Sequence, residues 1–198
     1  VIVSGITGAA FRMVGPVYGA AIGLSADRLA LFLAAYVAGG AAAQLPLGWL
    51  ADRIERRKMM TGLAAATMVA CLLMLVVQTA DWRWVFAGAF LFGFCTFPLY
   101  SVAAAHSNDL ALDTDRVELS AALMFLYALG AIASPYLTSA LIAAFGPGAM
   151  FVFLALVHVA LIGFAFYRMM VAPGHKAPRT GYTYLPRTSF TIGRLLGR

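Results

Sequence analysis

The sequence predicts an all-α, polytopic membrane protein with six transmembrane helices. Hydrophobic residues make up 63% of the 198 residues, charged residues make up 11%, and the mean hydropathy is +0.88. A soluble domain has about 45–50% apolar and about 25% charged residues, so this chain has too little polar surface to cover a particle in water. The apolar residues also gather into long runs that short polar links separate, as in a bundle of spanning helices.

Six apolar runs are long enough to cross a bilayer, whose ~30 Å hydrocarbon core requires about 20 helical residues. Transmembrane strands are excluded, because such strands are shorter and alternate apolar with polar residues. The short links make each helix antiparallel to the next, which gives one six-helix bundle over residues 1–172. The expected spans are 2–23, 29–51, 59–79, 84–105, 118–144 and 148–170.

The spans differ in what interrupts their apolar character. The first contains a charged residue, Arg12, and a row of glycines at a spacing of four, and the second contains Gly39 and Gly40. Small residues let helices approach closely in lipid. A proline in each of the first, second, fourth and fifth spans removes a backbone donor, so local bends are expected there. The prolines are Pro16, Pro46, Pro98 and Pro135.

The distribution of basic residues predicts the orientation of the bundle. Eleven of the fourteen Lys and Arg residues lie in the second and fourth links or toward the C-terminal end, whereas the other links carry only Arg28 and Arg83. Lys and Arg concentrate on the cytoplasmic side of membrane proteins. Both ends of the chain are therefore expected in the cytoplasm, with residues 173–198 as a basic tail. Because the charges follow this membrane pattern, the net charge of +6 does not predict nucleic-acid binding.

Arg12 is the sharpest candidate for a functional residue. It precedes Ser25 by thirteen residues, or ~20 Å of helix, which places it near the bilayer centre. All eight acidic residues of the chain lie in links or at helix ends. Arg12 therefore pairs with an acid on protein absent from this chain, meets an anionic ligand, or bonds backbone carbonyls.

Further polar residues suit a cavity that binds a polar molecule. The fifth span carries a stripe on one face, because its members follow one another at steps of three, four or seven. Such a stripe faces either a cavity or another helix. The candidates beside Arg12 are Tyr36, Gln44, Thr96, Tyr100, Tyr127, Ser134 and Thr138.

No enzyme chemistry is expected. The spans contain no catalytic motif, and Cys71 and Cys95 lie in apolar runs without metal-binding spacing. We therefore expect no cofactor and no metal, with coupling to a proton or a counter-solute as the remaining possibility. The polar group His106 to Asp109 is expected to cap the inner end of the fourth helix. The chain begins with Val1 inside an apolar run, and we expect an N-terminally truncated chain.

The link between the second and third spans resembles the motif G-x-L-a-D-r-x-G-r-k of the major facilitator superfamily. Glu55 stands where the motif has its second Gly, a departure common in the copy found in the second half of these proteins. Residues 11–19, 30–58, 105–109, 127–135 and 185–189 resemble the second half of the YcaD-like branch. The residues that match the motif are Gly48, Leu50, Ala51, Asp52, Arg53, Arg56 and Arg57.

The resemblance implies that the six helices are the seventh to twelfth of a twelve-helix fold in the inner membrane. Its partners would be the lipid bilayer, an N-terminal six-helix half and a small solute, and its mechanism would be alternating access. It also implies a cytoplasmic latch formed by Asp52 and Arg56, which Arg53 and Arg57 support. We expect the C-terminal half of a secondary active transporter; the alternative is a non-transporting sensor or scaffold with the same fold.

Overall fold

A computed structural model describes residues 1–111 and 115–171, apart from the side chain of Asp52. The tail expected at 173–198 lies outside these residues. The described chain is helical throughout, and five helices are each long and apolar enough to cross a membrane. The first expected span is divided into three short pieces. The elements are α1 (Ile2–Ala9), η1 (Ala10–Val14), α2 (Gly15–Ala21), α3 (Ala26–Arg53), α4 (Arg56–Val77), α5 (Trp82–Asn108), α6 (Arg116–Phe145) and α7 (Ala149–Val171).

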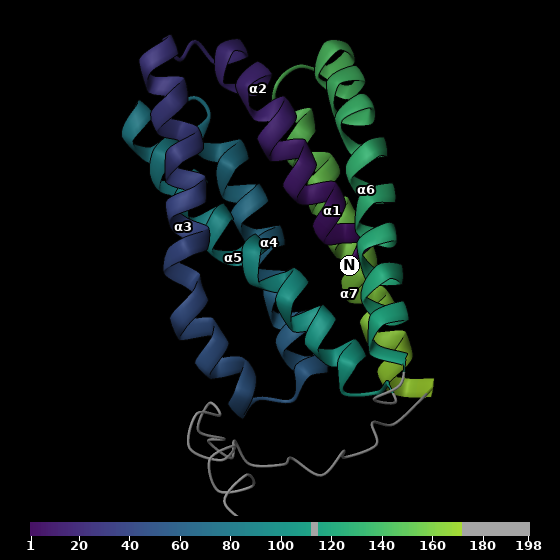
Figure 1. Ribbon diagram of the computed structural model, residues 1–198. Coiled ribbons are helices and arrows are strands. Elements are labelled where there is room, and N and C mark those ends of the chain that lie inside the picture. The colour runs from purple at the N-terminus through teal and green to yellow at the C-terminus, as the bar shows by residue number, and fades with distance from the viewer. Residues whose placement is uncertain (112–114, 172–198) are drawn as a thin grey trace, which may run out of the picture.

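The helices stand side by side in one bundle (Figure 1). The links α3–α4 and α5–α6 lie at one end of the bundle, and the links α2–α3 and α6–α7 lie at the other (Figure 1). The principal pairs are α3 with α5, α1 with α6, and α4 with both α5 and α7. All six expected spans fall on these elements, so the predicted all-α, six-helix membrane fold is confirmed.

An aromatic cluster fills the centre of the bundle. Phe11 stacks on Tyr36 with ring centroids 4.1 Å apart, and it also contacts Phe32, Phe92 and Phe151. These rings come from four elements of the chain, η1, α3, α5 and α7, and Tyr18 of α2 packs against Phe32 and Phe151 of the same group. Offset and edge-to-face ring pairs contribute beyond the area they bury, so this cluster ties the first span to the other helices.

Helices α3 and α5 approach so closely that their backbones touch across glycines. A Cβ atom on Gly93 would lie 1.9 Å from the carbonyl oxygen of Tyr36, and one on Gly39 would lie 1.9 Å from that of Phe90. Real Cβ contacts are never that short, so any larger residue would force the two helices apart. The small-residue face expected on the second span therefore packs against the fourth.

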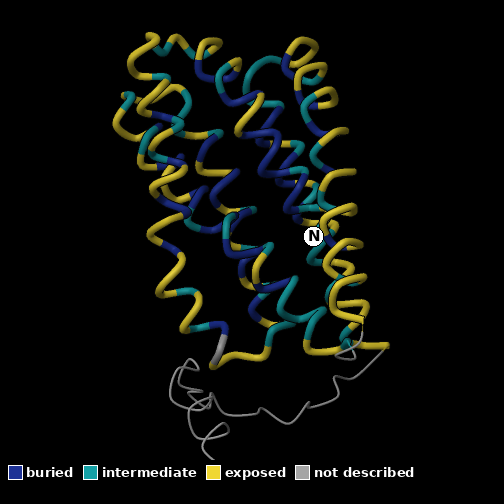
Figure 2. The backbone as a smooth tube through the Cα atoms, viewed as in Figure 1, coloured by how far each residue is buried: buried dark blue, intermediate teal, exposed yellow. Residues whose placement is uncertain are grey.

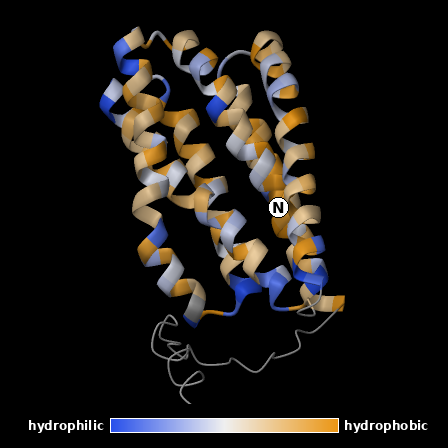
Figure 3. Ribbon diagram, viewed as in Figure 1, coloured by the Kyte–Doolittle hydropathy of each residue, from blue (hydrophilic) through white to orange (hydrophobic). Residues whose placement is uncertain are grey.

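The surface of the bundle is apolar along the helices and polar at the ends. Exposed residues follow the outer faces of the helices over their whole length (Figure 2), and large apolar side chains such as Leu45 and Leu156 are among them. Hydrophilic segments gather near the links (Figure 3). A protein in water does not expose apolar side chains on this scale, whereas a lipid-embedded one does, so this is a multi-pass membrane protein.

Candidate functional site

The first span changes from an α-helix to a π-turn around Arg12, the residue singled out in the sequence. Arg12 is the central residue of η1, a single π-helical turn. Pro16 follows four residues later; it has no N–H to donate to the carbonyl of Arg12, and its ring would clash with that carbonyl in a regular α-helix. The widened turn relieves this conflict, and single π-turns are often found at functional sites. The sequence predicted a local bend in this span, and the structure has a π-turn there within an otherwise continuous run of helical backbone.

The π-turn separates two adjacent side chains. Phe11 is fully buried in the aromatic cluster, whereas Arg12 is exposed on the surface of the six-helix bundle. Its Nε donates to the carbonyl oxygen of Gly8 at 3.0 Å, and its Nη2 donates to the hydroxyl of Tyr127 at 2.5 Å. Neither partner carries a charge. Of the three roles left open for Arg12, backbone bonding is thus observed, but it leaves the charge uncompensated within the described chain.

Arg12 lies deep in the span, where an uncompensated charge is costly. Its partner Tyr127 is eleven residues into α6, or ~17 Å along a helix of about 45 Å. A cation near the bilayer centre costs at least ~2.5–3.5 kcal/mol. The exposed guanidinium of Arg12 must therefore be compensated by water, an anion or another protein surface on this face of the bundle.

Two contacts of Tyr100, one with Tyr127 and one with Met124, connect the Arg12–Tyr127 pair to α5. The rings of Tyr100 and Tyr127 meet edge to face, with centroids 5.4 Å apart and an interplanar angle of 81°. The hydroxyl of Tyr100 contacts the sulfur of Met124 at 3.3 Å. Both tyrosines are half-buried and Met124 is exposed. Arg12, Tyr100 and Tyr127, three of the expected site residues, are thus brought together on one surface.

The other expected residues lie elsewhere. Tyr36 and Thr96 are buried in the bundle and contact each other through their hydroxyls. Ser134 and Thr138 are fully buried, and Ser134 donates to the carbonyl oxygen of Ile6 at 2.7 Å. Ser134 thus faces another helix, whereas the buried hydroxyl of Thr138 has no hydrogen-bond partner among the described residues. Gln44 is exposed on α3 and makes no side-chain hydrogen bond to the described residues.

Gly8 belongs to the site and was missed in the sequence. A Cβ atom there would lie 3.0 Å from Nη2 of Arg12 and 3.2 Å from the hydroxyl of Tyr127. Its lack of a side chain lets the guanidinium fold back over α1 and reach both partners. The sequence could have indicated Gly8, because it precedes Arg12 by one helical turn and therefore lies on the same face of the helix.

A groove of about 860 Å³ lies at the opposite end of the bundle from the α3–α4 link. Its walls come from α4, α6 and α7 and are almost entirely apolar, with Gln78 and Thr79 as polar exceptions. None of the expected site residues lines it. The groove offers no charged side chain and few polar ones to fix a ligand, so the Arg12 surface is the better candidate site.

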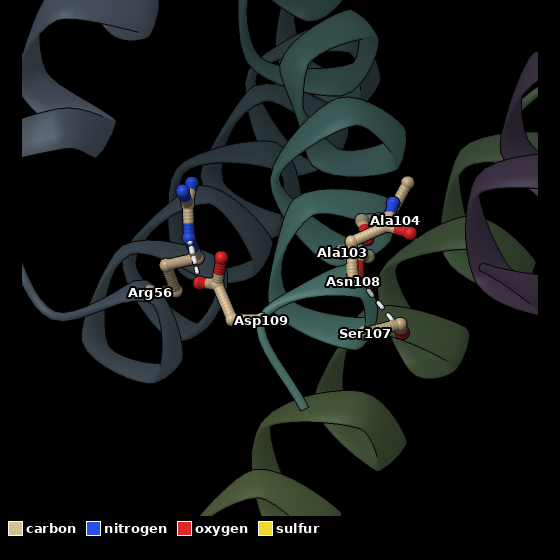
Figure 4. A network of polar contacts seen from close by, with 6 residues as sticks. All are labelled: Arg56, Ala103, Ala104, Ser107, Asn108 and Asp109. Atoms are coloured by element: carbon tan, nitrogen blue, oxygen red, sulfur yellow. Dashed lines mark hydrogen bonds and ion pairs between the residues drawn. The ribbon is translucent and has the colours of Figure 1, made fainter. Parts of the chain in front are cut away.

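The end that carries the α3–α4 link holds a second group of charges. The guanidinium of Arg56, at the start of α4, forms an ion pair with Asp109, directly after α5 (Figure 4). α5 ends three residues beyond the expected end of the span, and the side chains of Ser107 and Asn108 donate to the carbonyls of Ala103 and Ala104, one turn earlier in the same helix (Figure 4). The later carbonyls of Ala105, Ser107 and Asn108 accept from backbone N–H groups instead, so these side chains do not cap the helix end. The expected latch residue Arg56 has a partner within this bundle.

The remaining latch residues are arranged around the same link. The guanidinium of Arg53 lies 3.8 Å from the ring centre of Trp49, and Lys58 pairs with Glu55 at 3.4 Å. Arg57 also has an interaction partner, and Gly48 is exposed. The side chain of Asp52, the other main latch candidate, lies outside the described residues.

Glu55 shows why the motif tolerates the loss of its second glycine. Glu55 has φ −56° and ψ 125°, and Ile54 before it is extended. Neither residue needs the left-handed conformation that favours glycine. The turn between α3 and α4 therefore forms without a glycine at this position.

Comparison with known protein families decides the identity of this helical unit. A family model described as Major Facilitator Superfamily matches residues 1–196. The chain belongs to the major facilitator superfamily. An uncharacterized MFS-type transporter of Enterobacter sp. (strain 638) is 27% identical over 154 residues, which cover 78% of this chain and 39% of that protein. The uncharacterized MFS-type transporter YcaD of Escherichia fergusonii matches with the same identity and coverage.

Both of these relatives are described as MFS-type transporters. The expected resemblance to this superfamily, and to YcaD among its members, is confirmed at low identity. The chain spans about two fifths of the length of the curated relatives it matches, 39% in each case. The motif around Asp52 and the Arg12 surface are thus features of one part of a major facilitator fold.

Proposed function

We propose that this chain is the C-terminal six-helix half of a secondary active transporter, which moves a small solute across the inner membrane by alternating access. The observation that carries this proposal is the exposed and uncompensated cation in the middle of the first span, within a bundle of a transporter superfamily. A midplane site between two six-helix units suits such a residue, because each unit then supplies one wall.

Two further observations support a single six-helix half, and the second of them favours the C-terminal one. The chain matches about two fifths of its relatives, 39% of each, as one six-helix half would. Glu55 replaces the glycine of the motif, as in copies from the second half of these proteins. In this arrangement the α3–α4 and α5–α6 links face the cytoplasm, following the excess of Lys and Arg there.

The cytoplasmic charges fit a role in switching between states. The Arg56–Asp109 pair joins the ends of α4 and α5, and its side chains are 27% and 42% exposed. Exposed ion pairs contribute only ~0.2–1 kcal/mol. A contact of that size can shift the balance between inward-open and outward-open states without holding either one permanently.

The test is reconstitution of the complete transporter that contains this chain into proteoliposomes. With an imposed proton or counter-solute gradient, we expect saturable uptake of at least one solute from a panel of organic acids, amines, sugars and amino acids. Arg12→Ala should lower the uptake rate by about tenfold or more, and Arg12→Lys should retain part of it. Arg28→Ala, which changes an outer cation beside Trp82, is the matched control and should leave uptake unchanged.

The alternative function makes a different prediction. A sensor or scaffold with this fold would give no uptake of any solute, and no solute would raise the melting temperature of the protein. That combination would overturn the transporter proposal. Uptake that is independent of Arg12 would preserve the transporter and move its binding site elsewhere.

A further inference from the structure

The guanidinium of Arg12 is only partly used by its protein partners. Arginine has five N–H donors, and two of them bond Gly8 and Tyr127. No other hydrogen bond or ion pair involves Arg12 in residues 1–111 and 115–171. Three donors therefore remain on an exposed guanidinium, and a carboxylate can take two of them in one plane.

Tyr127 adds a fourth donor to this surface. Its hydroxyl oxygen accepts from Arg12 at 2.5 Å, so its own proton must point to a different acceptor. No acceptor for this proton is found among the described residues. A hydroxyl polarised by a cation is a stronger donor than a free one, because hydrogen bonds in a chain reinforce one another.

The surface next to these donors is aromatic. The ring of Tyr100 stands edge to face against Tyr127, and its hydroxyl lies against the sulfur of Met124. Met124 is 62% exposed. A small inorganic anion would leave this apolar surface unused, whereas an organic anion could place its apolar body on the rings.

Gly8 holds the arrangement open. A methyl group there would come within 3.0 Å of Nη2 of Arg12 and 3.2 Å of the Tyr127 hydroxyl. Nη2 of Arg12 and the Tyr127 hydroxyl would each have to give way by a few tenths of an ångström, which alters the geometry between them. Gly8 is therefore a positioning residue, whose substitution displaces the charge without removing it.

We propose that Arg12 and Tyr127 form the anion subsite of the transported solute, and that this solute is an organic carboxylate with an apolar, preferably aromatic, body. The carboxylate accepts from Arg12 and from the Tyr127 hydroxyl, and the body packs on Tyr100 and Met124. This inference rests on the proposed transporter function, because it names the class of solute for that same surface.

Binding to the complete transporter, purified in detergent, tests the proposal without requiring transport. The probes are benzoate, phenylacetate and octanoate, each compared with its neutral amide in calorimetry and in thermal unfolding. We expect the carboxylates to bind and to raise the melting temperature, with the aromatic acids binding more tightly than octanoate and the amides binding at least tenfold more weakly.

Variants of the chain assign the binding to this surface. Arg12→Gln should weaken benzoate binding by about tenfold or more, and Tyr127→Phe by about threefold to tenfold, because the phenol proton is lost. Gly8→Ala should also weaken binding, although the charge is kept. Arg28→Gln is the matched control, and its affinity should equal that of the parent.

Several results would overturn the proposal. Acids and amides that bind equally well would exclude an anion subsite. Arg12→Gln with unchanged affinity would place the subsite elsewhere. If an acid of the N-terminal half neutralises Arg12, none of the carboxylates will bind the parent protein. Uptake of a neutral or cationic solute with no carboxylate binding would overturn the solute class but keep the transporter proposal. Arg12-dependent binding of carboxylates without uptake of any solute would keep the ligand class but overturn the transporter proposal.

Discussion

At the scale of single residues, Phe11 and Arg12 show how one helical turn can send adjacent side chains into opposite environments. Their side chains are adjacent in sequence, yet one is fully buried among aromatic rings and the other is exposed. The sequence could identify Arg12, because no acid lies in any span to compensate it. It could not identify Tyr127 as the partner, because that contact joins residues 115 positions apart through the packing of α6 on η1.

Ser134 provides a residue-scale test of the α1–α6 contact. Its hydroxyl is fully buried and donates to the carbonyl oxygen of Ile6 at 2.7 Å. That carbonyl also accepts the backbone N–H of Ala10, so losing the serine does not leave it unpaired. Interhelical hydrogen bonds in membranes contribute about 0.6 kcal/mol on average and about 1.7 at most. We expect Ser134→Ala to lower the melting temperature of the complete protein in detergent by about 1–5 °C.

The neighbouring serine serves as the control for that measurement. Ser139 lies on the same helix but is exposed, so Ser139→Ala should change the melting temperature by less than about 1 °C. Equal effects of the two substitutions would show that the Ser134 bond does not stabilise the bundle.

At the scale of helices, the number and approximate ends of the spans could be predicted, whereas their internal irregularities could not. Long apolar runs are sufficient to predict spanning helices. The π-turn in the first span arises from the conflict between Pro16 and the carbonyl of Arg12. Pro46 and Pro135 also lie inside helices, but α3 and α6 continue through them without a break. Whether a proline breaks a helix depends on the surrounding packing, and a single sequence does not contain that information.

The contact between α3 and α5 provides an element-scale prediction. Gly93→Ala would place a Cβ atom 1.9 Å from the carbonyl oxygen of Tyr36. A backbone atom cannot rotate away as a side chain can, so the helices must separate and the aromatic cluster must repack. We expect a loss of about 1–3 kcal/mol or more in unfolding free energy, measured as a lower melting temperature of the complete protein in detergent.

Gly62 is the matched control for that substitution, because a Cβ atom there would have no neighbour within 4 Å. Gly62→Ala should leave stability unchanged or raise it by up to about 1 kcal/mol, since alanine is the better helix former. A Gly93→Ala protein as stable as the Gly62→Ala protein would mean that the two helices are not in backbone contact.

At the scale of the whole molecule, the six-helix arrangement and the superfamily could be predicted from the sequence, but the composition of the candidate site only in part. Composition and the motif around Asp52 were sufficient to predict the six-helix arrangement and the superfamily. Arg12, Tyr100 and Tyr127 meet on one surface, whereas Ser134 bonds another helix and Thr138 is buried in the bundle. Helical periodicity predicts that residues share a face, but it does not determine what that face contacts.

The orientation of the whole bundle in the membrane can be tested with two single cysteines. Leu110 is 65% exposed beside the α5–α6 link, and Ala80 is exposed in the α4–α5 link at the other end. The native Cys71 and Cys95 are buried and should not react.

Because Lys and Arg concentrate on the cytoplasmic side, we expect a membrane-impermeant maleimide to label Ala80→Cys in intact cells and to label Leu110→Cys only in inverted vesicles. The parent protein, which lacks both added thiols, gives the background in each preparation. Labelling of Leu110→Cys in intact cells, with Ala80→Cys protected, would reverse the orientation and place the Arg56–Asp109 pair on the outer side of the membrane.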